Sequence, residues 1–181
     1  MSTHSANNGR ARHSDATQQQ YGVIPWRRDK HDCVRVLLIT SRTHHRWIVP
    51  KGWPIQGRAA YMSAALEAFE EAGVIGDIQT RPIATYHHEK NYADGTQQYR
   101  RVTLFGMRVR GTLTNWPERE ERQRRWFSLD EAAEVIGDRE LADILEYISG
   151  APEALTTFSR SAAITDVQQP APSIATGLLH P

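Results

Sequence analysis

The spacing of hydrophobic and polar positions changes repeatedly along the middle of this chain. Residues 33–40 are apolar and β-branched at nearly every position, which is typical of a strand buried on both faces. A helical spacing predicts a helix over residues 59–72, ended by Gly73. Shorter runs bounded by turn residues predict further strands at residues 21–26, 46–49, 83–89, 101–109 and 125–127.

The predicted strands are separated by turns and followed by helices. Ser128 and Glu131 form a capping box, which predicts the start of a helix, and another helix is expected at residues 139–148. Residues 50–54 and 91–95 are rich in turn-forming residues. Strands mixed with helices in this way predict a layered α/β or α+β domain.

The two ends of the chain differ in composition from the middle. Residues 1–20 are polar, with almost nothing to bury, and predict a disordered lead. Residues 150–181 are rich in Ala, Pro and Ser and predict a tail, with a short helix near residues 153–158. The folded domain is therefore expected at residues 21–149.

Composition excludes some classes of function. The net charge of +1 favours no particular partner, and there is no nucleic-acid-binding signature beyond a short arginine run. No apolar run approaches the roughly 20 residues that span a bilayer, and the N-terminus has no apolar signal region. We therefore expect a cytoplasmic protein without nucleic-acid or membrane partners, and its oligomeric state stays open. Cys33, the single cysteine, is expected to be a buried structural thiol.

The predicted helix at residues 59–72 carries the candidate chemistry. At 100° per residue, Glu67, Glu70 and Glu71 fall within one arc of about 100°. Ala60 and Ala64 lie beside them and leave room for a bulky group. The opposite face holds the residues expected to face the core, Met62, Ala65, Phe69 and Ala72.

Three carboxylates one turn apart repel each other, and a hard divalent cation removes that repulsion. Mg²⁺ prefers carboxylate oxygens together with waters and substrate phosphates. A solvated acidic helix face is the alternative that spacing alone leaves open.

The residues around this helix resemble the Nudix box. That family motif runs Gly, five residues, Glu, seven residues, Arg-Glu, an aliphatic residue, any residue, Glu-Glu, any residue, Gly and an aliphatic residue. Six positions match at the right spacing: Gly52, Glu67, Glu70, Glu71, Gly73 and Val74. The resemblance implies an α/β fold, the Nudix-type α/β/α sandwich with a mixed β-sheet, and hydrolysis of a phosphoanhydride bond.

The resemblance also implies roles for the site residues. Glu67 and Glu71 are expected to hold Mg²⁺, or Mn²⁺, with a backbone carbonyl of Lys51 or Gly52 as a further ligand. Glu70 is expected to act as the general base. The sequence shows only that the three glutamates share a face, so their roles could be permuted.

Two positions depart from the motif. Arg58 stands where the motif has its first Glu, and Leu66 stands where it has Arg. In the family these two side chains commonly pair and brace the loop against the helix. We interpret the double change as loss of a brace and not of metal binding. A Nudix-fold module that binds or senses nucleotides or polyphosphates is the competing hypothesis.

Beyond the box, the chain resembles the diphosphoinositol polyphosphate phosphohydrolase branch, whose members hydrolyse diphosphoinositol polyphosphates and dinucleoside polyphosphates. The similarity lies in residues 36–50 and 116–132. By position, Arg42, Lys90 and Arg122 are similar to phosphate contacts of that branch, and Arg124 belongs to the same arginine run. Arginine forks suit phosphate oxygens, although this run could instead be a solvated face.

Other signals in the sequence are weaker. That branch has basic residues where this chain has Gln18–Gln20, which favours a less charged substrate such as a dinucleoside polyphosphate. The His44–His45 and His87–His88 pairs have no further ligand at a useful spacing and are interpreted as surface histidines. Four tryptophans could stack on a nucleobase, although packing is the expected role for most of them: Trp47, Trp53, Trp116 and Trp126.

Overall fold

The computed structural model describes residues 17–91 and 97–156 of the 181-residue chain. It contains the strands β1 (Gln18–Arg28), β2 (Val34–Thr40), β3 (Trp47–Ile48), β4 (Lys51–Gly52), β5 (Val74–Ile78), β6 (Ala84–Asn91), β7 (Gln97–Thr112) and β8 (Arg124–Ser128). The helices are α1 (Ala60–Ala72), α2 (Leu129–Val135), α3 (Arg139–Gly150) and α4 (Glu153–Thr156).

The described strands form one mixed sheet. Its central order is β3-β2-β1-β7-β5, with β4 paired to β1, β6 to β7 and β8 to β2. β1 and β7 run parallel, with Ile24 opposite Gly106, whereas the other strand pairs are antiparallel. This pairing joins segments far apart in the sequence at the centre of the domain.

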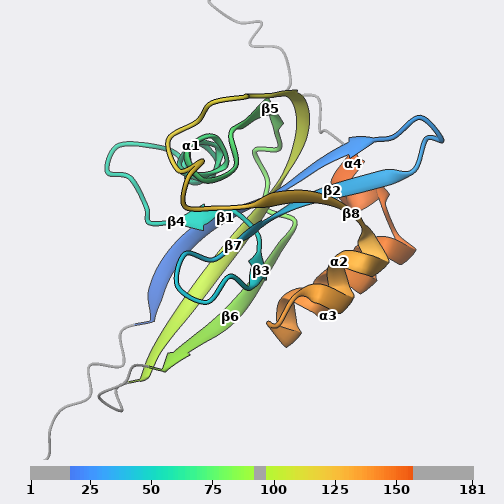
Figure 1. Ribbon diagram of the computed structural model, residues 1–181. Helices are drawn as coiled ribbons and strands as arrows, with labels where there is room; N and C mark the ends of the chain where they lie inside the picture. The colour runs from blue at the N-terminus through green and yellow to red at the C-terminus, as the bar shows by residue number, and fades with distance from the viewer. Residues whose placement is uncertain (1–16, 92–96, 157–181) are drawn as a thin grey trace, which may run out of the picture.

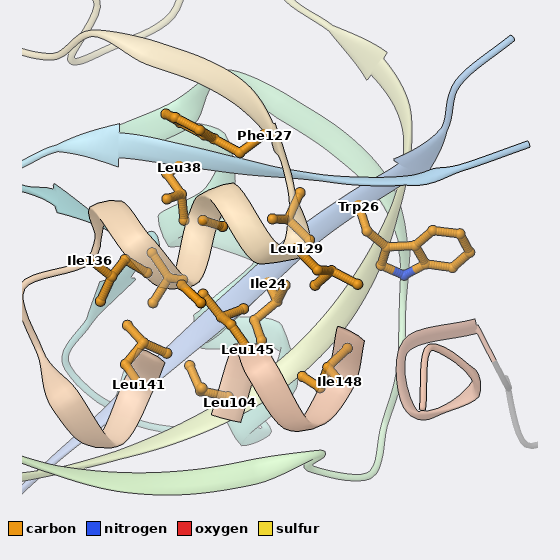
Figure 2. Close-up of a cluster of buried hydrophobic side chains, with 14 of the residues drawn as sticks. Ile24, Trp26, Leu38, Leu104, Phe127, Leu129, Ile136, Leu141, Leu145 and Ile148 are labelled. Carbon is orange, nitrogen blue, oxygen red and sulfur yellow. The ribbon is translucent and has the colours of Figure 1, made fainter. Parts of the chain in front are cut away.

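Helices cover both faces of the sheet, so the predicted α/β/α sandwich is confirmed (Figure 1). α2 and α3 pack over one face, where Leu141 and Leu145 meet Ile24 and Leu104 (Figure 2). α1 packs over the other face through its alanines. β2 contributes alternate residues to the two cores, as expected for a strand buried on both sides.

The helix face that α1 buries differs from the predicted one. Ala64, Ala68 and Ala72 are fully buried, whereas Met62 and Phe69 are 45% and 37% exposed. Small side chains at i, i+4 and i+8 let the helix lie close to the sheet, and the larger apolar residues are left outside. The expectation that Met62 and Phe69 face the core was wrong, as was the expectation that Ala64 leaves room beside the carboxylates.

Strand boundaries differ from the predicted ones at several places. β1 begins at Gln18, so the last three residues of the predicted disordered lead belong to the sheet. β4 and β5 were not predicted, since a two-residue strand and the sequence Val-Ile-Gly-Asp-Ile show little alternation. The predicted short helix after residue 150 is present as α4, and its last two residues lie outside the described range. All of the predicted loop at 91–95 except Asn91, which ends β6, also lies outside it.

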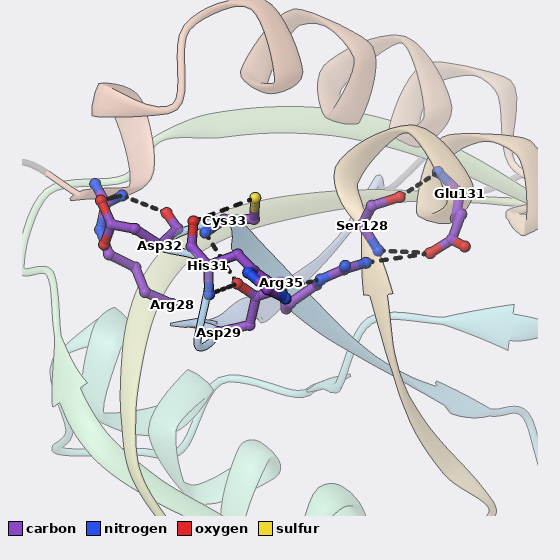
Figure 3. Close-up of polar contacts among 8 residues, drawn as sticks. All are labelled: Arg28, Asp29, His31, Asp32, Cys33, Arg35, Ser128 and Glu131. Carbon is purple, nitrogen blue, oxygen red and sulfur yellow. Dashed lines mark hydrogen bonds and ion pairs between the residues drawn. The ribbon is translucent and has the colours of Figure 1, made fainter.

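The turn between β1 and β2 and the start of α2 are joined by polar contacts (Figure 3). The Asp29 carboxylate accepts hydrogen bonds from the backbone N–H groups of His31 and Cys33 and from Arg35. Ser128 and Glu131 form the predicted capping box. Cys33 is exposed in the turn, because β2 begins one residue later, so the expectation of a buried thiol was wrong.

Candidate functional site

α1 holds the three predicted glutamates at its C-terminal half, beside β4. Gly73 ends the helix in the left-handed conformation, with φ of 60°, and its N–H donates to the Phe69 carbonyl. A Cβ at this position would lie 2.6 Å from the Trp116 ring. The tight turn therefore brings the segment that follows β7 against the end of the helix.

Glu71 is the most deeply buried of the three carboxylates, with 7% of the residue exposed. One of its oxygens accepts a hydrogen bond from the backbone N–H of Lys51 at 3.0 Å. The other oxygen accepts one from Arg122, with which it forms an ion pair. Burial raises the pKa of Glu71, and the charge of Arg122 and the Lys51 hydrogen bond oppose that rise.

Glu67 faces the same two-residue strand. A Cβ at Gly52 would overlap the Glu67 carboxylate, so any other residue here would displace that carboxylate from its position. Burial, together with the negative charges of Glu71 and Glu70, raises the pKa of Glu67 to about 7. The three helix carboxylates therefore form one cluster of interacting negative charges, as the sequence predicted.

A fourth carboxylate belongs to this cluster and was not predicted. Glu118 lies between β7 and β8, and its backbone N–H donates to the Glu70 carbonyl at 3.1 Å. Its side chain accepts a hydrogen bond from Arg122 at 2.5 Å, and its charge raises the pKa of both Glu67 and Glu71. No local spacing relates Glu118 to the helix glutamates, because the two segments are far apart in the chain.

The four predicted substrate-binding residues lie in different environments. The Arg42 side chain is 60% exposed and forms ion pairs with Glu118 and Glu121 at 3.8 and 3.5 Å. The guanidinium of Arg124 donates to the carbonyls of Ala72, Gly73 and Leu113. Lys90 lies on β6, and its side chain is outside the described part of the structure.

Arg122 is turned inward, with 4% of its side chain exposed. Besides Glu71 and Glu118, it donates to the Thr40 carbonyl at 3.0 Å. Each of its nitrogens is therefore bonded to a protein acceptor. For both Arg122 and Arg124 the structure places the guanidinium on protein oxygens, where the sequence predicted phosphate contacts.

The oxygen donors at this site fit a hard divalent cation whose remaining coordination positions are filled by water or phosphate oxygens. Within the described residues, no three Asp, Glu, His or Cys side chains converge closely enough to hold a metal alone. Mg²⁺ usually takes one or two carboxylates and fills its remaining positions with waters and phosphates. Glu67 and Glu71 supply two carboxylates, and the backbone of Lys51 and Gly52 lies directly against them.

A second group of polar residues lies around the Lys51 side chain, on the face of the sheet opposite α1. Gln20 and Arg100 lie on neighbouring strands, and the Lys51 side chain shares their face. Burial lowers the pKa of Lys51. The Gln20 side-chain oxygen is buried and has no hydrogen-bond partner among the described residues. His88 shares this face and bonds Asp138 at 2.7 Å, so it is tied to α3.

Trp53 differs from the other three candidate tryptophans. Trp47 packs edge-on against Phe127, and Trp116 lies beneath Arg124. Trp126 is half-buried beneath Arg27. Trp53, next to Gly52, is 47% exposed, and the Arg100 guanidinium lies 5.1 Å from its ring centre. Of the four, Trp53 therefore presents the most exposed indole, one residue after Gly52 and on the side of Arg100.

The comparisons with known proteins agree on one family. A family model described as NUDIX domain matches residues 17–147. Nudix hydrolase 12, mitochondrial, of Arabidopsis thaliana is 30% identical over 129 residues, which are 67% of this chain and 59% of that protein. Diphosphoinositol polyphosphate phosphohydrolase 3-beta of Bos taurus is 27% identical over 66% of this chain and 69% of its own length.

Solved structures show the same fold. A binary complex of C. elegans Ap4A hydrolase superposes with a TM-score of 0.57 at 20% identity, covering 75% of this chain and 98% of that one. At this identity the similarity concerns the fold alone. Among the helices of the described residues, none is both long enough and apolar enough to cross a membrane.

Proposed function

The chain belongs to the NUDIX domain family, and on that premise we propose that it is a Mg²⁺-dependent hydrolase of phosphoanhydride bonds. The observation that carries this proposal is the carboxylate cluster of α1 against the backbone of Lys51 and Gly52. A solvated acidic face would not bury Glu71 or bring the Glu67 carboxylate against the Gly52 backbone. The burial of these carboxylates favours metal binding over the solvated alternative.

The proposed reaction is attack of water on a phosphorus atom, with cleavage of the phosphoanhydride P–O bond. When bound, Mg²⁺ would neutralise phosphate oxygens and make water a better nucleophile. Glu67 and Glu71, with a carbonyl of Lys51 or Gly52, would hold the cation. Glu70, which is less buried than Glu71, accepts the proton of the attacking water. Mn²⁺ suits the same oxygen donors.

The substrate phosphates meet Arg42 and Lys90 in this proposal. Arg42 is exposed, and its two ion pairs with Glu118 and Glu121 are long enough to be exchanged for phosphate contacts at little cost. Lys90 is retained on the resemblance alone. The inward-facing Arg122 and Arg124 are left out of the phosphate-binding set.

Among polyphosphorylated substrates, we propose dinucleoside polyphosphates over diphosphoinositol polyphosphates. Trp53 offers an exposed indole one residue after Gly52, and a nucleobase has a π-face to stack on it, whereas an inositol ring has none. The uncharged Gln18–Gln20 segment of β1 suits a less charged ligand. The Bos taurus relative is named for diphosphoinositol polyphosphates and the C. elegans structure for Ap4A, so both classes require testing.

A product-release screen with Mg²⁺ tests this proposal. Diadenosine polyphosphates, diphosphoinositol polyphosphates, nucleoside triphosphates and inorganic polyphosphate are offered to the full chain. We expect the highest kcat/KM for a diadenosine polyphosphate. Tight binding of one of these compounds without product under any divalent metal would favour the competing sensor hypothesis.

The cytoplasmic location predicted from the sequence stays a prediction, since the Arabidopsis relative is named as mitochondrial.

The stacking role of Trp53 gives a sharper test of the substrate class. Base–aromatic stacking contributes about 1–3 kcal/mol per base, so Trp53→Ala should raise KM for a diadenosine polyphosphate about tenfold. Trp53→Phe should restore most of the affinity. Tyr147→Ala, which removes a 72% exposed aromatic on α3, is the matched control. An equal loss with diphosphoinositol polyphosphate would show that Trp53 does not read the base.

A further inference from the structure

Arg122 connects three parts of the molecule through one buried guanidinium. It lies two residues before β8 and donates to Glu71 on α1, to Glu118 in its own segment, and to the Thr40 carbonyl at the end of β2. With 4% of the side chain exposed, it has little contact with solvent. Such a planar fork fixes the direction of each of its bonds.

Glu71 is held from two sides by this arrangement. Arg122 binds one carboxylate oxygen, and the Lys51 N–H binds the other at 3.0 Å. Both partners lie outside α1, so the carboxylate is fixed relative to β4 and β8 as well as to its own helix. A carboxylate held at both oxygens keeps its direction when the helix or the loop fluctuates.

The chain departs from the family motif at two positions, one in the loop before α1 and one in the helix. Arg58 is exposed, and Leu66 carries no charge, so the usual brace between these positions is absent. The segment after β7 is instead attached to the end of α1 at several points. Glu118 N–H binds the Glu70 carbonyl, Leu113 N–H binds the Gly73 carbonyl, and Arg124 binds the last carbonyls of the helix.

From these contacts we infer that Arg122 is a positioning residue, which orients Glu71 for the divalent cation and takes over the role of the missing brace. The inference rests on the proposed function. For Arg122 to bind substrate phosphate, it would have to leave the buried carboxylate of Glu71 without this counter-charge, which is strongly unfavourable. A positioning role requires no such movement.

The test measures Mn²⁺ affinity without substrate, by the paramagnetic resonance signal of free Mn²⁺. Arg122→Met should weaken Mn²⁺ binding about 10- to 100-fold, as loss of a partner that orients a metal ligand commonly does. Arg122→Lys should recover part of that loss. Arg124→Met is the matched control, because Arg124 ties the same segment to α1 through backbone carbonyls only. It should lower thermal stability but change Mn²⁺ affinity less than about threefold.

The kinetic counterpart separates positioning from phosphate binding. At saturating Mg²⁺, Arg122→Met should lower kcat while KM for the substrate changes little. Unchanged Mn²⁺ affinity with a raised KM would overturn the inference and make Arg122 a phosphate ligand. Tighter Mn²⁺ binding would also overturn it, since Arg122 would then be a counter-ion that competes with the metal.

A second variant and the wild-type control distinguish failure of this inference from failure of folding or of the proposed function. If Arg122→Met does not fold, Glu118→Gln removes the ionic anchor that holds Arg122 from its own segment, and it should weaken Mn²⁺ binding in the same direction. Mn²⁺ affinity equal to that of the wild type in this variant and in Arg122→Lys would contradict the inference. A wild-type chain that binds no Mn²⁺ and hydrolyses nothing would refute the proposed function itself, which is a different result.

Discussion

Glu67, Glu70 and Glu71 lie within one turn and a half of the same helix, yet their surroundings differ. Glu71 is bonded at both oxygens, and Glu67 packs against the backbone of Gly52. Glu70 bonds the loop after β7 only through its backbone carbonyl, which leaves its carboxylate the least engaged of the three in the described structure. Neighbouring residues of one type can therefore serve different roles.

Substitution of single carboxylates tests those roles. Glu70→Gln keeps the size of the side chain but removes its basicity, so turnover should fall by about 10²- to 10⁴-fold, with little change in substrate affinity. Glu71→Gln should instead weaken Mg²⁺ binding and recover activity at higher metal concentration. Steady-state rates at several Mg²⁺ concentrations distinguish the two. Near-normal turnover of Glu70→Gln beside an inactive Glu67→Gln would assign the base to Glu67.

The raised pKa of Glu67 predicts how metal-free stability depends on pH. The folded protein binds a proton with a pKa of about 7, whereas the ordinary value is 4.5, so folding takes up a proton between these values. The unfolding free energy should therefore fall as pH rises through this window. Glu67→Gln removes that fall, and it should be more stable than the wild type at pH 8 but closely similar at pH 5.

Thermal unfolding in EDTA measures this difference. Glu134→Gln, which changes an exposed glutamate of α2, serves as the control and should follow the wild type at both pH values. If Glu67→Gln and the wild type differ by the same amount at pH 5 and pH 8, Glu67 does not titrate in the way described.

At the scale of single residues, local spacing predicted the three helix glutamates and Gly73 but not their partners. Glu118 and Arg122 reach α1 only through the path of the chain after β7, which no local pattern encodes. Cys33 was expected to be buried in a strand, but β2 begins one residue later and Cys33 lies in the exposed turn before it.

At the scale of elements, α1 shows how a helix can bury the face that hydrophobicity does not favour. Its buried stripe is Ala64, Ala68 and Ala72, and close approach to the sheet selects these small residues over Met62. Hydrophobic spacing predicted the extent of the helix correctly, since its ends depend on Gly73 and on local propensity. It could not predict the distance between α1 and the sheet, which determines which face of the helix is buried.

Substitutions on the two faces of α1 test this packing. Ala68→Leu should destabilise the protein by about 1–3 kcal/mol, because the added carbons have no space against the sheet. Met62→Ala, at an exposed position, should change stability by less than about 0.5 kcal/mol. Urea unfolding of both variants measures the difference. A larger loss for Met62→Ala would mean that the other face packs against the sheet.

At the scale of the whole molecule, the alternation of strands and helices was enough to predict a layered α/β domain. The mixed sheet was expected from the family resemblance, since the parallel pairing of β1 with β7 leaves no local signal. That pairing sets the centre of the sheet, and β4 then pairs with β1 beneath the C-terminal half of α1. The site therefore depends on a helix that the sequence predicted and on a strand pairing that it did not predict.

The central claim is that the carboxylates of α1 and the adjoining β4 backbone support metal-dependent cleavage of a phosphoanhydride bond. The most direct test follows product release from a diadenosine polyphosphate by the full chain, first in excess EDTA and then after Mg²⁺ is added in excess over the chelator. We predict no detectable product in EDTA and restored turnover with Mg²⁺ or Mn²⁺. Undiminished turnover in excess EDTA would contradict the account.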